Sequence, residues 1–322
     1  NLASTLQSQG DLAGARQLEE TALEARRCLL GAEHPNTLTA MNNLALTLES
    51  QGDLASARQL EETALAARRR ELGAEHPDTL TAMNNLALML KSQGDLAGAR
   101  QLQETALEAY RRVLGAEHPD TLTSMNNLAL TLKSQGDLAS ARQLQETVLE
   151  ASRRVLGAEH PDTLNSMNNL ASTLYSQGDL ADARTLEETA LEASRRVLGA
   201  EHPDTLAAMN NLAVTLQSQG DLAGARQLKE TVLEARRRLL GAEHPDTSVS
   251  AWSYLTSLLQ SREPEAALEV LANDLAWLLT RDAATLGADQ RSIAGMLREL
   301  LERDERDGSA SRDARIDEKG GL

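Results

Sequence analysis

Apolar and polar positions along the chain repeat every 42 residues, and within each repeat they follow the spacing of a helix. In the copy at 35–76, the first apolar pattern has the spacing i, i+3, i+6, i+7 and i+10: Leu38, Met41, Leu44, Ala45 and Leu48. A second pattern of apolar and small residues comes after Ser-Gln-Gly-Asp: Leu54, Ala57, Leu60, Ala64 and Ala67. This spacing predicts two amphipathic helices per repeat, here called helix A and helix B.

Residues that start and stop helices stand at the ends of both patterns. Pro35 suits the first turn of helix A, where its missing N–H costs nothing. We expect helix A to run to about Ser50, with Gly52 as a left-handed cap. Asp53 then caps helix B, and Gly73 ends it.

The period is marked by Glu-His-Pro, which holds every histidine of the chain: His34, His76, His118, His160, His202 and His244. The expected organisation is a partial repeat (1–34), five full repeats (35–76, 77–118, 119–160, 161–202 and 203–244), a divergent last repeat with a capping helix (245–304) and a disordered tail (305–322). In the capping helix we expect five residues to face inward: Ile293, Met296, Leu297, Leu300 and Leu301. Stacked helix pairs of this length bury a continuous core only against their neighbours.

Composition narrows the fold and excludes some partners. The chain has no Phe, two Trp and three Tyr, so Leu, Ala, Val and Met must form the core of an all-α protein. Its formal net charge of -16 disfavours binding to nucleic acid or to anionic membranes. The single cysteine, Cys28, and the lack of a long apolar run fit a cytoplasmic protein.

The segment 42–58 reads Asn-Asn-Leu-Ala-x-x-Leu-x-x-Gln-Gly-Asp-Leu-x-x-Ala-Arg and resembles the tetratricopeptide repeat. The 42-residue length and the Leu-Gly-x-x-His-Pro-Asp-Thr junction are similar to the kinesin-light-chain type of that repeat. The resemblance covers about residues 1–285. It implies a right-handed superhelical solenoid of antiparallel helix pairs, whose A helices line a concave groove that binds peptides or proteins. Leu48 and Leu54 stand where the family often has aromatic residues.

A candidate binding face lies on the A helices, beside the core stripe. One column of this face is constant: Asn42, Asn84, Asn126, Asn168 and Asn210. Because amides donate and accept hydrogen bonds, this column could hold an extended peptide backbone of any sequence.

Three neighbouring columns change from repeat to repeat and would supply selectivity. The first contains Thr39, Thr81, Thr123, Asn165 and Ala207. The second contains Leu46, Leu88, Leu130, Ser172 and Val214. The third contains Glu49, Lys91, Lys133, Tyr175 and Gln217. Lys91 and Lys133 could bind an acidic side chain, with Tyr175 as a contact beside them.

Packing is the alternative role for the asparagines. A recently duplicated array inherits all its residues, so a constant column can reflect copying alone. We expect the column that begins at Asn43 to hold helix A to its neighbours, whereas the column of Asn42 is equally compatible with packing and with binding.

Catalysis and metal binding are not expected. Zinc needs ligands that converge on one ion, whereas each histidine lies in a separate repeat and suits a helix entry. The glutamate pairs on helix B, such as Glu61-Glu62 and Glu187-Glu188, are interpreted as a solvated face. No phosphate-binding loop or Gly-x-Ser-x-Gly elbow occurs, so we expect no enzyme activity, cofactor or metal.

The sequence therefore predicts an intracellular scaffold that binds a protein or peptide. One alternative is the sensor or regulatory array of a larger multidomain effector, which the start of the chain within a repeat suggests. Another is an array that associates with itself through its N-terminal end.

Overall fold

The computed structural model describes residues 2–8 and 10–301, and all regular secondary structure in these ranges is helical. The described chain forms two compact units, of which the first extends through Leu228 and the second begins at Lys229. The A helices are α3 (Pro35–Gln51), α5 (Pro77–Ser92), α7 (Pro119–Ser134), α9 (Pro161–Gln177), α11 (Pro203–Ser218) and α13 (Pro245–Gln260). The B helices are α2 (Leu12–Leu30), α4 (Leu54–Leu72), α6 (Leu96–Val113), α8 (Leu138–Val155), α10 (Leu180–Val197) and α12 (Leu222–Leu240). A short helix, α1 (Leu2–Ser8), comes before them.

Each A helix begins at the proline that follows a histidine. In α7 the Nδ1 atom of His118 accepts a hydrogen bond from the backbone N–H of Asp120 at 3.2 Å, so the histidine is the N-cap. The other five histidines make the same contact with the residue two positions on. The expected helix-entry role of the histidines is therefore confirmed.

The predicted ends of the first full repeat are also confirmed. Gly52 has a φ of 84° and ends α3 in the left-handed conformation. The side chain of Asp53 accepts a hydrogen bond from the backbone N–H of Ser56 at the start of α4. Gly73, with a φ of 91°, ends α4.

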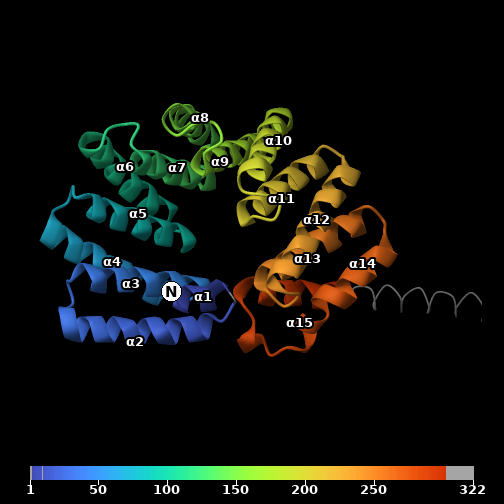
Figure 1. The fold of residues 1–322 in the computed structure, drawn as a ribbon, viewed down its shortest axis with the longest axis horizontal. Coiled ribbons are helices and arrows are strands. Elements are labelled where there is room, and N and C mark those ends of the chain that lie inside the picture. Colours follow the sequence, from blue (N-terminus) through green and yellow to red (C-terminus); the bar gives the residue numbers. More distant parts are fainter. Residues whose placement is uncertain (1, 9, 302–322) are drawn as a thin grey trace, which may run out of the picture. The chain divides into compact units, whose positions relative to one another are not determined.

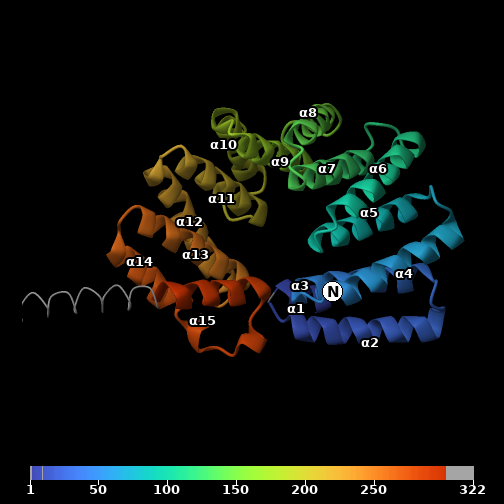
Figure 2. The ribbon, with the colours of Figure 1, turned by 180° about the vertical axis from the view of Figure 1, so that it is seen from behind.

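In the first unit the helices form two layers. The odd-numbered helices from α3 to α11 lie on the inner side of its curve, and the even-numbered helices lie outside them (Figures 1 and 2). Each B helix packs against the A helix of its own repeat and the A helix of the next, as α4 does with α3 and α5. The predicted stripe of α3 is buried against Ala57, Ala64 and Ala67 of α4. These contacts confirm the predicted all-α solenoid of antiparallel helix pairs.

Two polar contacts recur between neighbouring repeats of this unit. The glutamine at the end of each A helix donates a hydrogen bond to the carbonyl at the start of the preceding B helix: Gln51 to Leu12, Gln93 to Leu54, Gln135 to Leu96, Gln177 to Leu138 and Gln219 to Leu180. Four glutamates of the Glu-His-Pro loops pair with an arginine at the end of the next B helix: Glu33 with Arg70, Glu75 with Arg112, Glu117 with Arg154 and Glu159 with Arg196. These contacts fix the register of successive repeats.

The second unit departs from the repeat by one extra residue. Its last B-type segment contains α14 (Pro264–Val270), a π-helical turn (Leu271–Leu275) and α15 (Trp277–Thr280), and a 3-10 turn (Ala283–Thr285) follows. A π-turn accommodates a single inserted residue. The pair between Glu243 and Arg281 accordingly spans 38 residues, whereas the equivalent pairs of the first unit span 37.

Within the second unit, a charged pair and a last helix complete the packing. Asp274 of the π-turn is buried and accepts two hydrogen bonds from Arg237, at 2.8 and 2.6 Å. Residues 288–301 form a helix whose Ile293 and Leu297 join the core.

Two of the residues expected to face inward on that helix do not. Met296 and Leu301 are exposed, so the prediction for them was wrong. Met296 follows Ile293 by three residues and Leu301 follows Leu297 by four, so the two flank the stripe on opposite sides. The predicted tail, 305–322, lies outside the described residues, and the predicted domain boundaries stay predictions.

Candidate functional site

The predicted face of the A helices is accessible in the first unit. Leu46 is 57% exposed, Leu88 and Val214 are exposed, and Leu130 is half-buried. The threonine column is exposed as well, and each of its hydroxyls donates to the proline carbonyl four residues earlier, as Thr123 does to Pro119 at 3.0 Å. The face thus offers apolar side chains next to polar ones.

The constant asparagines are less exposed than the threonine column, and their hydrogen bonds differ from repeat to repeat. The side-chain oxygen of Asn42 accepts a hydrogen bond from Arg68 at 3.4 Å, and that of Asn84 accepts one from Ser124 at 3.4 Å. The side-chain oxygens of Asn126 and Asn168 are buried and have no hydrogen-bond partner within the described part of the chain. The column therefore contains both packing contacts and unused acceptors. Asn210 is half-buried.

Side chains of the third variable column connect successive A helices. The hydroxyl of Ser92 donates to Glu49 at 2.5 Å, Lys133 donates to Ser172 at 2.5 Å, and the hydroxyls of Tyr175 and Ser218 are 2.8 Å apart. Lys91 and Gln217 of this column are half-buried.

The two lysines of this column share a polar but partly desolvated environment. Burial lowers the pKa of Lys91 and of Lys133, and the charge of Lys91 lowers the pKa of Lys133 further. The effect of Lys91 on Lys133 is the repulsion between two positive charges on neighbouring A helices.

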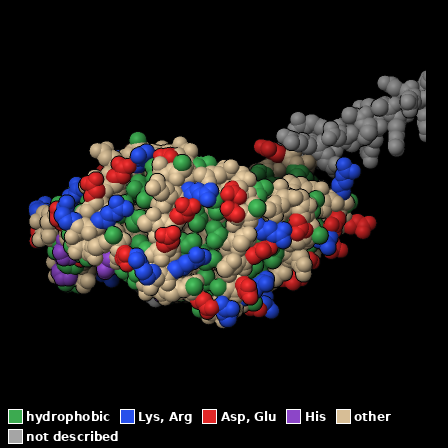
Figure 3. Space-filling model, turned by 90° about the horizontal axis from the view of Figure 1, so that it is seen from above, with side chains coloured by type: hydrophobic (Ala, Val, Ile, Leu, Met, Phe, Trp, Pro, Cys, Tyr) green, Lys and Arg blue, Asp and Glu red, His purple; other side chains and the backbone are tan. Residues whose placement is uncertain are grey.

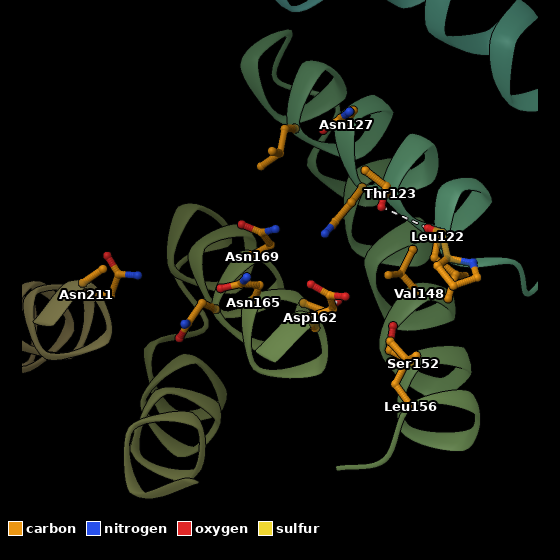
Figure 4. A pocket seen from close by; sticks show the side chains of 16 residues that line it. Leu122, Thr123, Asn127, Val148, Ser152, Leu156, Asp162, Asn165, Asn169 and Asn211 are labelled. Carbon is orange, nitrogen blue, oxygen red and sulfur yellow. Dashed lines mark hydrogen bonds between the residues drawn. The ribbon is translucent and has the colours of Figure 1, made fainter. Parts of the chain in front are cut away.

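A hollow with a volume of about 410 Å³ lies between α7, α8, α9 and α11, and we call it the Ser152 hollow. Six amide side chains line it: Asn126, Asn127, Asn165, Asn168, Asn169 and Asn211. Val148 and Ser152 of α8 and Leu156, which follows the helix, form another part of its wall, as Figure 4 shows. The hollow thus combines hydrogen-bonding groups with a short apolar surface, as ligand sites commonly do.

The Ser152 hollow exists because a large side chain is missing from one position of helix B. In the preceding repeat this position is Tyr110, which is 1% exposed. The hydroxyl of Tyr110 lies 3.0 Å from the hydroxyl of Thr81 and 3.4 Å from the carbonyl oxygen of Pro77. The residues 42 positions further on are Ser152, Thr123 and Pro119, and all three line the hollow.

A third version of the same space occurs in the first full repeat, where the position is Arg68. The hollow there has a volume of about 300 Å³ and is lined by Arg68 together with three carboxylates: Glu33, Glu71 and Asp78. Burial lowers the pKa of Arg68, and the nearby Glu61 and Asp78 oppose that effect. The space is therefore charged beside Arg68, filled by Tyr110 and open beside Ser152.

Sequence reasoning missed this position, although the signal was present. The column contains Arg26, Arg68, Tyr110, Ser152, Ser194 and Arg236, and it varies in size more than the chosen columns of helix A. The column of Asn43, expected to pack, also contributes Asn127, Asn169 and Asn211 to the hollow.

The interpretation of the glutamate pairs as a solvated face was wrong for one member of each pair. Glu62 and Glu188 are exposed and pair with Arg58 and Arg184. Glu61 and Glu187 are each 2% exposed, and burial raises the pKa of each from its ordinary value of 4.5 to about 7. The reason is geometric, because adjacent residues of a helix point about 100° apart.

Charged side chains of both signs are interspersed on the face of the molecule that Figure 3 draws, with apolar side chains between them. In the ranges that the structure describes, no three His, Cys, Asp or Glu residues are grouped so that they could hold a metal ion. No described helix is both long and apolar enough to cross a membrane.

The array of helix pairs and the repeated inner face define a helical-repeat protein. Tetratricopeptide-repeat models match residues 1–70, 78–152, 131–196 and 205–246. The chain belongs to the tetratricopeptide repeat family, whose repeats generally bind proteins or peptides.

Among solved structures, the chain is similar to proteins with kinesin-light-chain-like repeats. Two structures of a Podosopora anserina protein with nearly identical TPR-like repeats, assigned to the kinesin light chains, are 29% and 30% identical to it, with TM-scores of 0.54 and 0.53. Each match covers 64% of this chain and 97% or 98% of the other. BtubC (BKLC) from P. vanneervenii is 23% identical over 71% of this chain and 92% of its own, with a TM-score of 0.58, and supports the fold alone. A search of curated proteins found no match.

Proposed function

We propose that this protein is a non-enzymatic scaffold that binds an extended peptide, or an extended segment of a partner protein, along the inner-layer face of α5, α7, α9 and α11. The observation that carries the proposal is the Ser152 hollow, an open space lined by amide groups on this face. Membership of a family whose repeats bind proteins or peptides supports the same conclusion.

The backbone contacts are assigned to Asn126 and Asn168. Their buried oxygens have no hydrogen-bond partner in the described part of the chain, which is costly unless a ligand or solvent supplies a donor. A peptide N–H is such a donor, and each asparagine also has an NH₂ group for a peptide carbonyl. Asn210 would continue this row on α11. Asn42 and Asn84 already accept bonds from Arg68 and Ser124, so their contribution to the row would be smaller.

A bulky side chain of the ligand would enter the Ser152 hollow. Tyr110 shows what the equivalent space holds when it is filled, namely a phenol ring whose hydroxyl contacts a threonine hydroxyl and a proline carbonyl. Thr123 and Pro119 offer the same two groups in the hollow. Val148 and Leu156 supply apolar contact to a ring.

Lys91 and Lys133 would bind an acidic residue of the same ligand. Both are half-buried on the A helices, and burial lowers the pKa of each. A ligand carboxylate would relieve the repulsion between them. Glu49, Tyr175 and Gln217 continue this column toward the two ends. The exposed Leu46 and Leu88 and the half-buried Leu130 would provide apolar contacts.

The test is selection of peptides from a displayed random library on the full chain, followed by affinity measurement with synthetic copies. We expect the selected peptides to bind at least tenfold more weakly to the double variant Asn126→Ala with Asn168→Ala. The matched control is Glu150→Ala, an exposed residue of α8 that does not line the hollow, and it should leave the affinity unchanged. Circular dichroism would verify that each variant is folded.

Two results would contradict this function. One is a library that yields no binding peptide, and the other is a set of peptides that bind equally to the double asparagine variant and to the control. In either case the inner-layer face does not bind extended peptides in the proposed way.

A further inference from the structure

Helix B carries a buried polar residue at the same position in every copy: Glu19, Glu61, Gln103, Gln145, Glu187 and Lys229. None of these residues is more than 8% exposed. Buried ionisable groups are costly unless they are paired or neutral. The position therefore requires an explanation in each repeat where it is charged.

In the first copy, this residue of helix B is hydrogen-bonded to a residue of the next A helix. The hydroxyl of Thr47 on α3 donates a hydrogen bond to the carboxylate of Glu19 at 2.5 Å, and Thr47 follows Glu19 by 28 residues in the sequence. The residue 28 positions after Glu61 is Met89, which has no hydroxyl. Met89 packs in the same apolar cluster as Ala57 and Ala64, which flank Glu61 on α4.

The surroundings of Glu61 offer its carboxylate little compensation. Oε2 of Glu61 is buried and has no hydrogen-bond partner in the described part of the chain. Arg68 on the same helix favours the charged form, whereas Glu49 on α3 disfavours it. Among the charged residues of α5, Asp78 acts on Arg68. Burial has the largest effect, and it raises the pKa of Glu61 to about 7.

Glu187 is in a similar position at the junction of α10 with α11. Its Oε2 is buried and unpartnered among the described residues. Burial raises the pKa of Glu187 to about 7, and the hydroxyl of Thr215 on α11 opposes that effect only in part. No charged group of α9 or α11 is among the causes of its shift.

We propose that the α4–α5 and α10–α11 junctions are pH-sensitive joints, which are closed while Glu61 and Glu187 are protonated and loosen when these carboxyl groups lose their protons. Gln103 and Gln145 occupy the same position in the two middle repeats, and their amides do not titrate. The array would therefore loosen at two defined junctions and stay closed between them.

The direction of the pH effect follows from the protonation of the carboxyl group in the open and the closed junction. Below pH 4.5 the carboxyl group is protonated in the open and the closed junction alike, so the closed state has its full stability. As the pH rises toward 7, the open state loses its proton first, and the closed state becomes less favoured. Above about pH 7 the closed junction holds a buried carboxylate and the loss is complete.

Loosening at α10–α11 would also reach the Ser152 hollow, because α11 contributes Ala207 and Asn211 to its wall. The joint itself rests on the fold and not on the proposed function. Its test accordingly uses no ligand, so that the two proposals can fail separately.

The experiment is amide hydrogen exchange of the full chain at pH 5 and pH 8, corrected for the intrinsic effect of pH on exchange. In the wild type, the equilibrium constant for opening of α4, α5, α10 and α11 should be on the order of a hundredfold larger at pH 8 than at pH 5. The constant for α7 and α8 serves as the reference within the same chain. Glu61→Gln and Glu187→Gln should each abolish the increase at their own junction. Both variants should fold, because the chain already has glutamine at this position in two repeats.

The exposed neighbours provide the matched controls. Glu62→Gln and Glu188→Gln remove a charge one residue away and should leave the pH dependence as in the wild type. Met89→Thr restores a hydroxyl opposite Glu61 and should reduce the pH effect at the α4–α5 junction. The joint is refuted if Glu61→Gln and Glu187→Gln match their controls at pH 8, or if the junctions of Gln103 and Gln145 loosen equally.

Discussion

The repeats 77–118 and 119–160 have nearly the same sequence but contain different spaces. They differ at five equivalent positions: Ala82 and Ser124, Met89 and Thr131, Gly98 and Ser140, Ala106 and Val148, and Tyr110 and Ser152. The first repeat is filled by the ring of Tyr110, whereas the second is open at the Ser152 hollow. An array can thus keep one backbone and still have different spaces in successive repeats.

Two of the five differences act on the space directly. Tyr110 and Ala106 lie four residues apart on one face of α6, and Ser152 and Val148 have the same relation on α8. A large residue is therefore combined with a small one in the first repeat, and a small residue with a medium one in the second. The total side-chain volume falls in the second repeat, and the space that is left opens to the inner-layer face.

The largest expected effect is that of emptying the filled repeat. Tyr110→Ser removes a buried ring and two polar contacts, and should lower the free energy of unfolding of this repeat by about 3 kcal/mol. Urea unfolding and hydrogen exchange of α5 and α6 would measure the loss. The double variant Ala106→Val with Tyr110→Ser copies the next repeat and should recover part of it. A loss below about 1 kcal/mol would show that the ring contributes little to packing.

The reverse exchange should close the open repeat. Val148→Ala with Ser152→Tyr gives α8 the same pair that α6 has, and the new ring should fill the Ser152 hollow. Peptides selected on the wild type should then bind at least tenfold more weakly, a difference of about 1.4 kcal/mol or more. Titration of labelled peptides would measure the change, with Val148→Ala alone as the control. Equal affinity would place the peptide outside the hollow.

The smallest effect concerns a feature that the two repeats share. His118 and His160 cap their A helices with the same contact of 3.2 Å, so replacement of either by alanine should cost about 1 kcal/mol. Asparagine at either position should restore most of the cap. Hydrogen exchange in the first turns of α7 and α9 would measure both losses. Unequal losses would mean that the closed or open space changes the stability of the nearby helix end.

Local features of the fold were predictable because they depend on neighbours in the sequence. The period, the proline and histidine at the start of helix A, the cap at Gly52 and the buried stripe of α3 all follow from spacing and backbone preference. The same reasoning failed for Glu61, because charge alone indicated exposure. Glu61 is buried because it lies between Ala57 and Ala64, on the part of α4 that packs in one cluster with Met89 of the next repeat.

The candidate site was only partly predictable for the same reason. The asparagine columns were visible as constants, and five of their members line the Ser152 hollow: Asn126, Asn127, Asn168, Asn169 and Asn211. Ser152 lies on helix B, outside the predicted binding face of the A helices. Nothing in the linear order brings it beside Asn126, since the two residues meet only when α8 packs between α7 and α9.

The sequence by itself determined the helices, their ends and the 42-residue array, because helix periodicity and capping are properties of short segments. The tertiary structure alone decided which polar residues are buried, which asparagines keep an unused oxygen, and which repeat holds an open space. Those outcomes depend on the side chains that face one another from different helices. A difference of one ring at one position of helix B therefore changes the site while the fold stays the same.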